Sequence, residues 1–274
     1  MATIFDTEVM QGFIRLGNEG WKQGWHERNG GNLTYRMKAE EVDACRPYFY
    51  APGEWISLGL TVANLGGEYF LTTGTGKFFQ NFTVSPELAI GIAEINEAGD
   101  AYRLVWGLNE GKDRPTSEFP SHLMNHSVKK AANPDYRTIY HCHPIGVIAL
   151  TFILPLDNKT FSRALWSTMT ECPIIFPHGV AVIDWMMPGS LEVAKVTSEY
   201  MKEYDVAIWA HHGIFAASTD FDNTFGLMHT VEKSAQIYLN ILHTGKPILQ
   251  TITKEQFLAI EKDFKITLNH DFLD

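Results

Sequence analysis

The chain has 274 residues, a formal net charge of −10 at pH 7, and 45% hydrophobic residues, which is enough for a sizeable core. The acidic balance argues against nucleic acid or an anionic membrane as a partner, but it still allows a small anionic substrate where basic groups and amides gather. Three cysteines, an odd and sparse number, provide no disulfide framework.

No linker rich in proline, glycine or serine divides the chain, so we expect a single domain over residues 1–274. The amino terminus lacks a basic region followed by an apolar run. No stretch approaches the length of apolar sequence that a membrane span requires. We therefore expect a cytoplasmic protein with no membrane partner.

The first predicted helix covers residues 6–24, where apolar residues recur at helical spacing. Gly30 and Gly31 follow it, and Asn32–Arg36 has the pattern of a strand. A Gly-Gly turn flanked by Asn29 and Asn32 can present backbone amides to an anion. Spacing alone favours an ordinary turn.

A second glycine-rich loop follows a predicted strand over residues 68–72; the intervening residues 37–68 are rich in loops. Thr73-Gly74-Thr75-Gly76-Lys77 combines free amides, hydroxyls and a cation, which is the composition of a phosphate-binding loop. It lacks the spacing of a Walker motif, and an ordinary tight loop is the alternative.

Residues 90–95 and 101–106 predict a hairpin, after a short helical turn opened by Ser85-Pro86. A helix then runs to about Ala131, with Thr116 or Ser117 as its N-cap and a first turn suited to an anion. Glu118 in that turn is ordinarily a capping or dipole partner. It gains chemical interest only near a metal.

Two histidine-bearing segments predict a metal site. Residues 137–139 begin a strand, so His141 and His143 point to one face with Cα atoms roughly 6.5 Å apart and can share an ion. Cys142 faces the other side as packing. A second apolar run, residues 206–210, ends in His211-His212-Gly213, where a histidine beside a turning glycine is well placed as a third ligand. Three neutral imidazoles with one open position are typical of catalytic zinc, and hydrogen-bonded core histidines are the alternative.

Other residues compete for a role in the site. His122 and His126 lie four apart on the predicted helix and could bind a metal, although such a pair is more often polar helix surface. Glu171 precedes a predicted strand over residues 172–176, where site residues often lie in α/β folds; a solvated loop carboxylate is the ordinary interpretation.

The remaining segments predict mostly helices and an α/β domain of two or three layers. The longest predicted helix covers residues 221–244, and Thr253 with Gln256 forms a capping box for the last one. Shorter helices are expected over residues 147–154, 162–167 and 190–204.

Five motifs resemble, in their order, the class II sugar-phosphate aldolases of the aldolase/adducin-head superfamily, and the resemblance extends over nearly the whole chain. The motifs are Gly30-Gly31-Asn32, Thr73-Gly74-Thr75-Gly76, Thr116-Ser117-Glu118, His141-Cys142-His143 and His212-Gly213. The resemblance implies a three-layer α/β/α domain with a central, mainly antiparallel sheet. It also implies a homotetramer with sites between subunits.

The same resemblance implies one Zn²⁺ per subunit, with His141, His143 and His212 as ligands. It implies a set of residues around the substrate phosphate: Asn29, Gly31, Asn32, Thr73, Gly74, Thr75, Thr116 and Ser117. Thr75 stands where the family has serine, and its hydroxyl keeps the donor.

The implied activity is zinc-dependent cleavage of L-rhamnulose 1-phosphate to dihydroxyacetone phosphate and L-lactaldehyde, in L-rhamnose degradation. No lysine has an obvious Schiff-base setting, so a Lewis acid is favoured over an imine. Glu118 is expected to move the proton at C3, and Glu171 to serve the aldehyde half. The alternatives are a fuculose-1-phosphate aldolase, a pentulose-5-phosphate 4-epimerase, or a non-catalytic scaffold like the adducin head.

Overall fold

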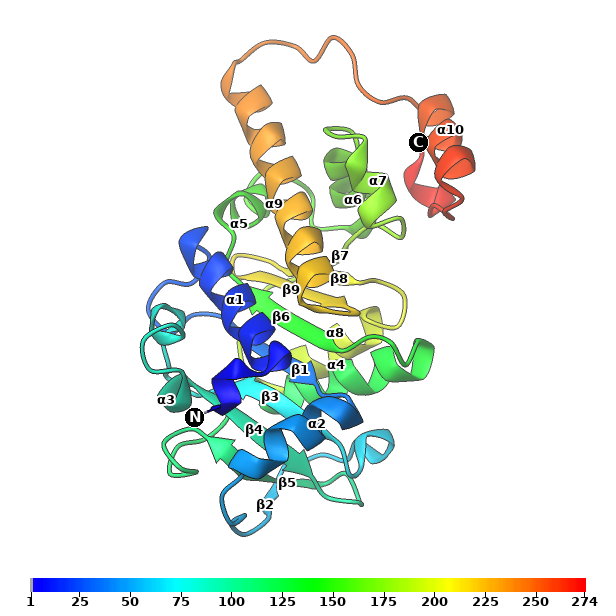
Figure 1. The fold of residues 1–274 in the computed structure, drawn as a ribbon. Helices are drawn as coiled ribbons and strands as arrows, with labels where there is room; N and C mark the ends of the chain where they lie inside the picture. Colours follow the sequence, from blue (N-terminus) through cyan, green and yellow to red (C-terminus); the bar gives the residue numbers. More distant parts are fainter. Residues whose placement is uncertain (1) are drawn as a thin grey trace.

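A nine-stranded sheet with the order β2-β5-β4-β3-β1-β6-β9-β8-β7 forms the centre of the computed structural model, which describes residues 2–274 (Figure 1). Neighbouring strands are antiparallel except for β7 and β8. The strands are β1 Asn32–Arg36, β2 Ile56–Ser57, β3 Tyr69–Thr73, β4 Ile90–Ile95, β5 Ala101–Gly107, β6 Thr138–Cys142, β7 Ala181–Ile183, β8 Val206–Trp209 and β9 Gly213–Ser218. The central, mainly antiparallel sheet predicted from the sequence is confirmed.

Helices cover both faces of this sheet (Figure 1). α9 (Phe221–His243) packs on β6 and β9 and against α1 (Glu8–Lys22), whereas α4 (Phe119–Ala132) packs on β1 and β6 and against α8 (Leu191–Tyr200). The other helices are α2 Ala39–Cys45, α3 Pro86–Ala89, α5 Ile145–Leu150, α6 Asn158–Trp166, α7 Glu171–Ile175 and α10 Lys254–Phe264. No helix in residues 2–274 is long and apolar enough to cross a bilayer.

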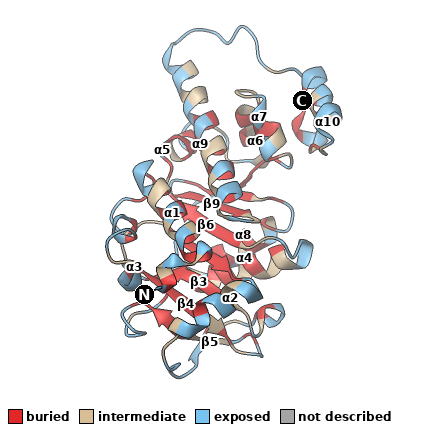
Figure 2. Cartoon of the chain, in the orientation of Figure 1, coloured by how far each residue is buried: buried red, intermediate tan, exposed pale blue. Residues whose placement is uncertain are grey.

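The central strands are buried on both sides, as Figure 2 shows in red. All five residues of β1 are buried, and so are all five of β6. A strand covered by helices on both faces needs no alternation of polar and apolar residues, and any polar side chain on it must find a partner inside the protein.

Three predictions about local structure were wrong. Residues 172–176 lie mostly in helix α7 rather than in a strand, because a short apolar run without alternation does not distinguish the two, and Pro173 fits the first turn of a helix. The N-cap of α4 is Glu118, not Thr116 or Ser117. Helix α2 was missed in the loop-rich region, although Glu41 Oε2 accepts a hydrogen bond from the backbone N–H of Lys38 at its start.

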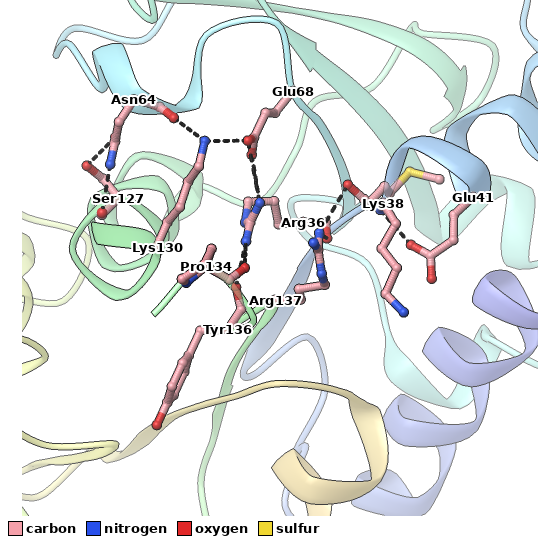
Figure 3. Close-up of polar contacts among 11 residues, drawn as sticks. Arg36, Lys38, Glu41, Asn64, Glu68, Ser127, Lys130, Pro134, Tyr136 and Arg137 are labelled. Carbon is pink, nitrogen blue, oxygen red and sulfur yellow. Dashed lines mark hydrogen bonds and ion pairs between the residues drawn. The ribbon is translucent and has the colours of Figure 1, made fainter. Parts of the chain in front are cut away.

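A network of ion pairs joins β1, β3 and α4 at one end of the central strands (Figure 3). The buried guanidinium of Arg36 lies 3.4 Å from the carboxylate of Glu68 and donates to the carbonyl of Tyr136 at 3.1 Å. Lys130 also pairs with Glu68, and Arg137 donates to the carbonyl of Arg36 at 3.2 Å. The histidines of interest lie at the opposite end of the same strands, where Asn32 pairs with His141.

Candidate active site

Three histidines meet at one end of the central strands. His141 lies on β6, His143 follows the strand, and His212 occupies the turn between β8 and β9. Pairing of β6 with β9 sets Cys142 opposite Ile214, which brings the two segments together. One ring nitrogen from each histidine lies within 4.8 Å of the others.

Hydrogen bonds determine which nitrogens of two of these rings carry protons. His141 Nδ1 donates to the carbonyl oxygen of Ile214 at 3.0 Å, and His143 Nδ1 donates to Glu27 Oε1 at 2.6 Å. Each Nε2 therefore keeps its lone pair, and the two Nε2 atoms lie 3.3 Å apart. Partners of this kind orient imidazoles toward a metal.

The donor set suits a divalent cation. Burial, together with the neighbouring His143, lowers the pKa of His212 to about 4, and burial lowers the pKa of His141 well below its usual value. Within residues 2–274, His212 Nδ1 is buried without a hydrogen-bond partner. Facing lone pairs repel one another unless a cation lies between them, and neutral imidazoles are the form that binds zinc.

His211 is turned away from this cluster. Its backbone adopts a left-handed conformation, with φ of 59°. Its ring lies 3.2 Å from the hydroxyl of Thr151 and packs against Phe152. The tight turn thus sends two adjacent histidines in different directions, and His212 is the one that joins His141 and His143.

Glu118 is a second carboxylate beside the three histidines, after Glu27. It is buried at the N-cap of α4, and its Oε2 lies 4.0 Å from His141 Nε2. The side-chain amide of Asn32 donates to the same oxygen at 2.8 Å. Burial raises the pKa of Glu118, and the hydrogen bond from Asn32 opposes that rise. A buried carboxylate beside a metal site is well placed to take and return a proton.

A cavity of about 190 Å³ connects the histidines and Glu118 to both glycine-rich loops. Seven of the eight residues predicted around a phosphate line this cavity, namely Asn29, Gly31, Asn32, Gly74, Thr75, Thr116 and Ser117. Gly30, Gly76 and Pro188 also line it. Thr73 is the exception, because its buried hydroxyl accepts from the backbone N–H of Leu33 at 3.3 Å. The structure therefore joins loops that are distant in the sequence into one small polar cavity.

Gly31 shows why this wall of the cavity tolerates no side chain. Its φ is +75°, and an added Cβ would lie 2.6 Å from the carbonyl oxygen of His141 and from the His26 ring. Only glycine allows the turn to pass this close to the metal-binding strand.

Other predicted residues lie elsewhere. Glu171 is exposed at the start of α7, which packs on α9 and α10, and it does not line the cavity of its own chain. His122 and His126 are buried, not on the polar helix surface, and they do not join the three-histidine cluster. Sequence reasoning missed Glu27 and Pro188. A carboxylate before the Gly-Gly turn was the only available signal for Glu27.

Comparison with known proteins gives the same picture over the full chain. Residues 11–239 match the family model described as the class II aldolase and adducin N-terminal domain. The chain is 38% identical over 276 residues to a rhamnulose-1-phosphate aldolase of Klebsiella pneumoniae strain 342, covering 100% of this chain and 99% of the relative. A rhamnulose-1-phosphate aldolase of Escherichia coli strain SE11 is 38% identical over 269 residues, with 97% of each chain covered.

Solved structures share the fold. A sugar-phosphate aldolase from Thermotoga maritima superposes with a TM-score of 0.75 at 26% identity, covering 88% of this chain and 97% of that one. An L-fuculose 1-phosphate aldolase superposes with a TM-score of 0.61 at 20% identity, covering 97% and 99%.

Proposed function

This chain belongs to the class II aldolase and adducin N-terminal domain family, and we propose that it cleaves L-rhamnulose 1-phosphate to dihydroxyacetone phosphate and L-lactaldehyde. The observation that carries the proposal is the meeting of three histidines, Glu118 and two glycine-rich loops in one cavity. The full-length similarity to rhamnulose-1-phosphate aldolases supports this choice of ketose.

The family is metal-dependent, and we assign one Zn²⁺ per subunit to His141, His143 and His212. When bound, the ion supplies Lewis-acid polarisation of the substrate carbonyl. Glu27 and the carbonyl of Ile214 hold two of the rings in the tautomer that exposes Nε2. The chain's own contribution is thus to present lone pairs at a fixed separation on the wall of the cavity.

Glu118 carries the proton at C3 of the dihydroxyacetone phosphate half. In the cleavage direction C3 gains a proton after the C3–C4 bond breaks, and in condensation the carboxylate removes that proton. A raised pKa suits this role, because the group must both hold and release a proton near neutral pH.

The glycine-rich loops are proposed to bind the phosphate. The backbone at Gly31, Gly74 and Gly76 lines one side of the cavity with the hydroxyl-bearing residues Thr75, Thr116 and Ser117. Binding the phosphate away from the bond that breaks orients the ketose without restricting the reacting carbons. Asn29 and Asn32 line the same cavity.

The assembly is proposed to be a homotetramer with its sites between subunits. Trp185 and Met187, which precede the cavity-lining Pro188, are 58% and 63% exposed, and Phe152, which packs against His211, is 70% exposed. Exposed large apolar side chains of this kind fit a protein interface. Glu171 retains its proposed role with the aldehyde half through a neighbouring subunit, since it does not line the cavity of its own chain. We place this enzyme in the cytoplasm.

The test is cleavage of L-rhamnulose 1-phosphate, followed by release of dihydroxyacetone phosphate, with metal content measured on the same sample. We expect activity to be lost when a chelator is added and in the His143→Ala variant. We expect it to be kept in His243→Ala, a control at an exposed position. Bound zinc without cleavage of this ketose would move the proposal to other ketose phosphates. Absence of both metal and cleavage would overturn it.

A further inference from the structure

A chain of hydrogen bonds runs through the protein interior from α4 to Glu118. His126 Nε2 lies 2.8 Å from the hydroxyl of Thr34, and that hydroxyl lies 2.8 Å from His122 Nδ1. His122 Nε2 hydrogen-bonds Asn32 Oδ1, and Asn32 Nδ2 donates to Glu118 Oε2 at 2.8 Å. Thr34, His122 and His126 are each no more than 1% exposed.

The direction of every link follows from Glu118. An ionised carboxylate only accepts, so the amide nitrogen of Asn32 faces it and the amide oxygen faces His122. His122 Nε2 must then carry the proton, which leaves Nδ1 as an acceptor for the hydroxyl of Thr34. Because that hydroxyl has one proton, His126 Nε2 has to donate to it. Four side chains thus have a single consistent arrangement of donors.

We propose that His122 is a positioning residue for Glu118, acting through Asn32, with Thr34 and His126 holding His122 in the Nε2–H tautomer. This inference rests on the proposed function, because it concerns proton transfer by Glu118. This chain of hydrogen bonds fixes the position of the Glu118 carboxylate. Glu118 has a rotatable side chain at a helix start, and the amide of Asn32, itself held by His122, keeps one carboxylate oxygen 4.0 Å from His141.

The amide of Asn32 is also occupied at both ends. Asn32 therefore contributes to the orientation of the base, in addition to lining the cavity. A wrong tautomer of His122 would present a bare nitrogen to the amide oxygen, and the contact would become repulsive. Small displacements of a catalytic group cost large factors in rate.

The first test replaces one hydroxyl. Thr34→Val keeps the shape of the side chain and removes the donor to His122, whereas Thr34→Ser retains it. Enzyme in D₂O with dihydroxyacetone phosphate alone reports proton removal at C3 as hydrogen–deuterium exchange. We expect exchange to fall by about tenfold in Thr34→Val and to stay within about twofold of wild type in Thr34→Ser. Metal content should be unchanged in both.

A matched control lies on the adjacent strand. Thr138 is fully buried, and its hydroxyl has no hydrogen-bond partner in the described chain. Thr138→Val makes the same chemical change but removes no hydrogen bond between His126 and Glu118. The rate of hydrogen–deuterium exchange at C3 should therefore be unaffected. Equal losses in Thr34→Val and Thr138→Val would show a general packing effect and would overturn the inference.

The second test acts on His122 itself. His122→Leu removes both contacts, whereas His122→Gln can still donate to one side and accept from the other. We expect about a hundredfold loss of kcat for His122→Leu, partial recovery for His122→Gln, and a much smaller change in KM, since Asn32 is the one residue of the proposed phosphate set that hydrogen-bonds His122. Exchange within twofold of wild type in both His122→Leu and Thr34→Val would refute the role.

The two proposals fail differently. If the wild-type protein neither cleaves the ketose nor exchanges the C3 proton, the proposed function falls and the role of His122 in that reaction falls with it. If the wild-type protein is active and the variants match it, only the positioning role is wrong. Neutron crystallography adds a readout independent of activity, because a proton on His122 Nδ1 would contradict the chain.

Discussion

At the scale of single residues, Glu27 gives the sharpest view of how the metal site is prepared. Its carboxylate accepts from His143 Nδ1 at 2.6 Å, while the carboxylate itself is 66% exposed. The short distance between the two side chains, rather than their burial, therefore characterises this contact. It determines which nitrogen of His143 faces the cluster.

We predict that Glu27→Ala weakens metal binding by about tenfold to a hundredfold, because His143 loses the partner that orients its ring. Competition with a chromophoric chelator measures the affinity directly. Glu19→Ala, in an exposed pair with Lys22, serves as the control and should bind the metal like wild type. Equal affinity in Glu27→Ala would show that His143 is oriented by packing alone.

A second prediction at this scale concerns Gly31. Gly31→Ala should lower the free energy of unfolding by about 3 kcal/mol or more, because a left-handed backbone and a clash with the His141 carbonyl add together. Gly24 also has a positive φ, of +77°, but its surroundings are open. Gly24→Ala should therefore lose only about 1 kcal/mol in urea unfolding. Similar losses for the two variants would show that the turn at Gly31 can shift.

At the scale of elements, the two ends of β1 have different roles. Asn32 serves the cavity, and Arg36 anchors the ion-pair network shown in Figure 3. Arg36 is nearly buried, with 5% of its side chain exposed, so its charge depends on Glu68. Removing one partner of a buried pair leaves an uncompensated charge.

Glu68→Gln should therefore destabilise the fold by about 3 kcal/mol while leaving metal affinity unchanged, since the network lies at the far end of the strand. Unfolding in urea and metal titration on the same sample separate the two effects. Glu199→Gln, in an exposed pair with Lys202, should change stability by less than about 1 kcal/mol. A parallel loss of metal affinity in Glu68→Gln would show that the two ends of β1 are coupled.

Elements with a clear pattern were predictable from the sequence. Strand Asn32–Arg36, the hairpin of β4 and β5, the long helix α9 and the capping box of α10 appear where expected. Residues 172–176 did not, because their apolar run reflects burial rather than strand alternation. The three-residue strand β7, one of the edge strands, offers too little sequence for any pattern.

The candidate site likewise has features that the sequence predicted and contacts that it did not. The histidine spacing and the glycine-rich loops were visible because each depends on neighbours in sequence. The contacts of Glu27 with His143 and of His122 with Asn32 depend on strand pairing and helix packing, which no local pattern reports. His122 was predicted on a polar surface because a histidine on a helix carries no sign of a buried partner.

At the scale of the whole molecule, buried histidines make stability depend on pH. Burial lowers the pKa of His122 to about 3 and that of His126 well below its usual value. In the unfolded chain both bind a proton below about pH 6.5, whereas the folded chain excludes it. Their contribution is therefore complete above that pH and is lost as the pH falls, in the case of His122 down to about 3.

We predict that the free energy of unfolding falls steeply between pH 6.5 and pH 5, with each of these histidines adding about 1.4 kcal/mol per pH unit to the slope. His126→Gln should flatten the slope by about that amount compared with wild type, measured by urea unfolding at several pH values. Because metal loss affects both proteins, the difference isolates His126. An unchanged slope would mean that this histidine is protonated in the folded state.

The strand order also determines when the centre can exist during biosynthesis. His141 and His143 leave the ribosome long before His212, and the pairing of β6 with β9 that unites them needs residues 213–218. A nascent chain that ends before β9 has two ligands on an exposed strand and no third. Binding of the ion by all three histidines is therefore a late event that follows synthesis of most of the chain. Early folding intermediates are not stabilised by the metal.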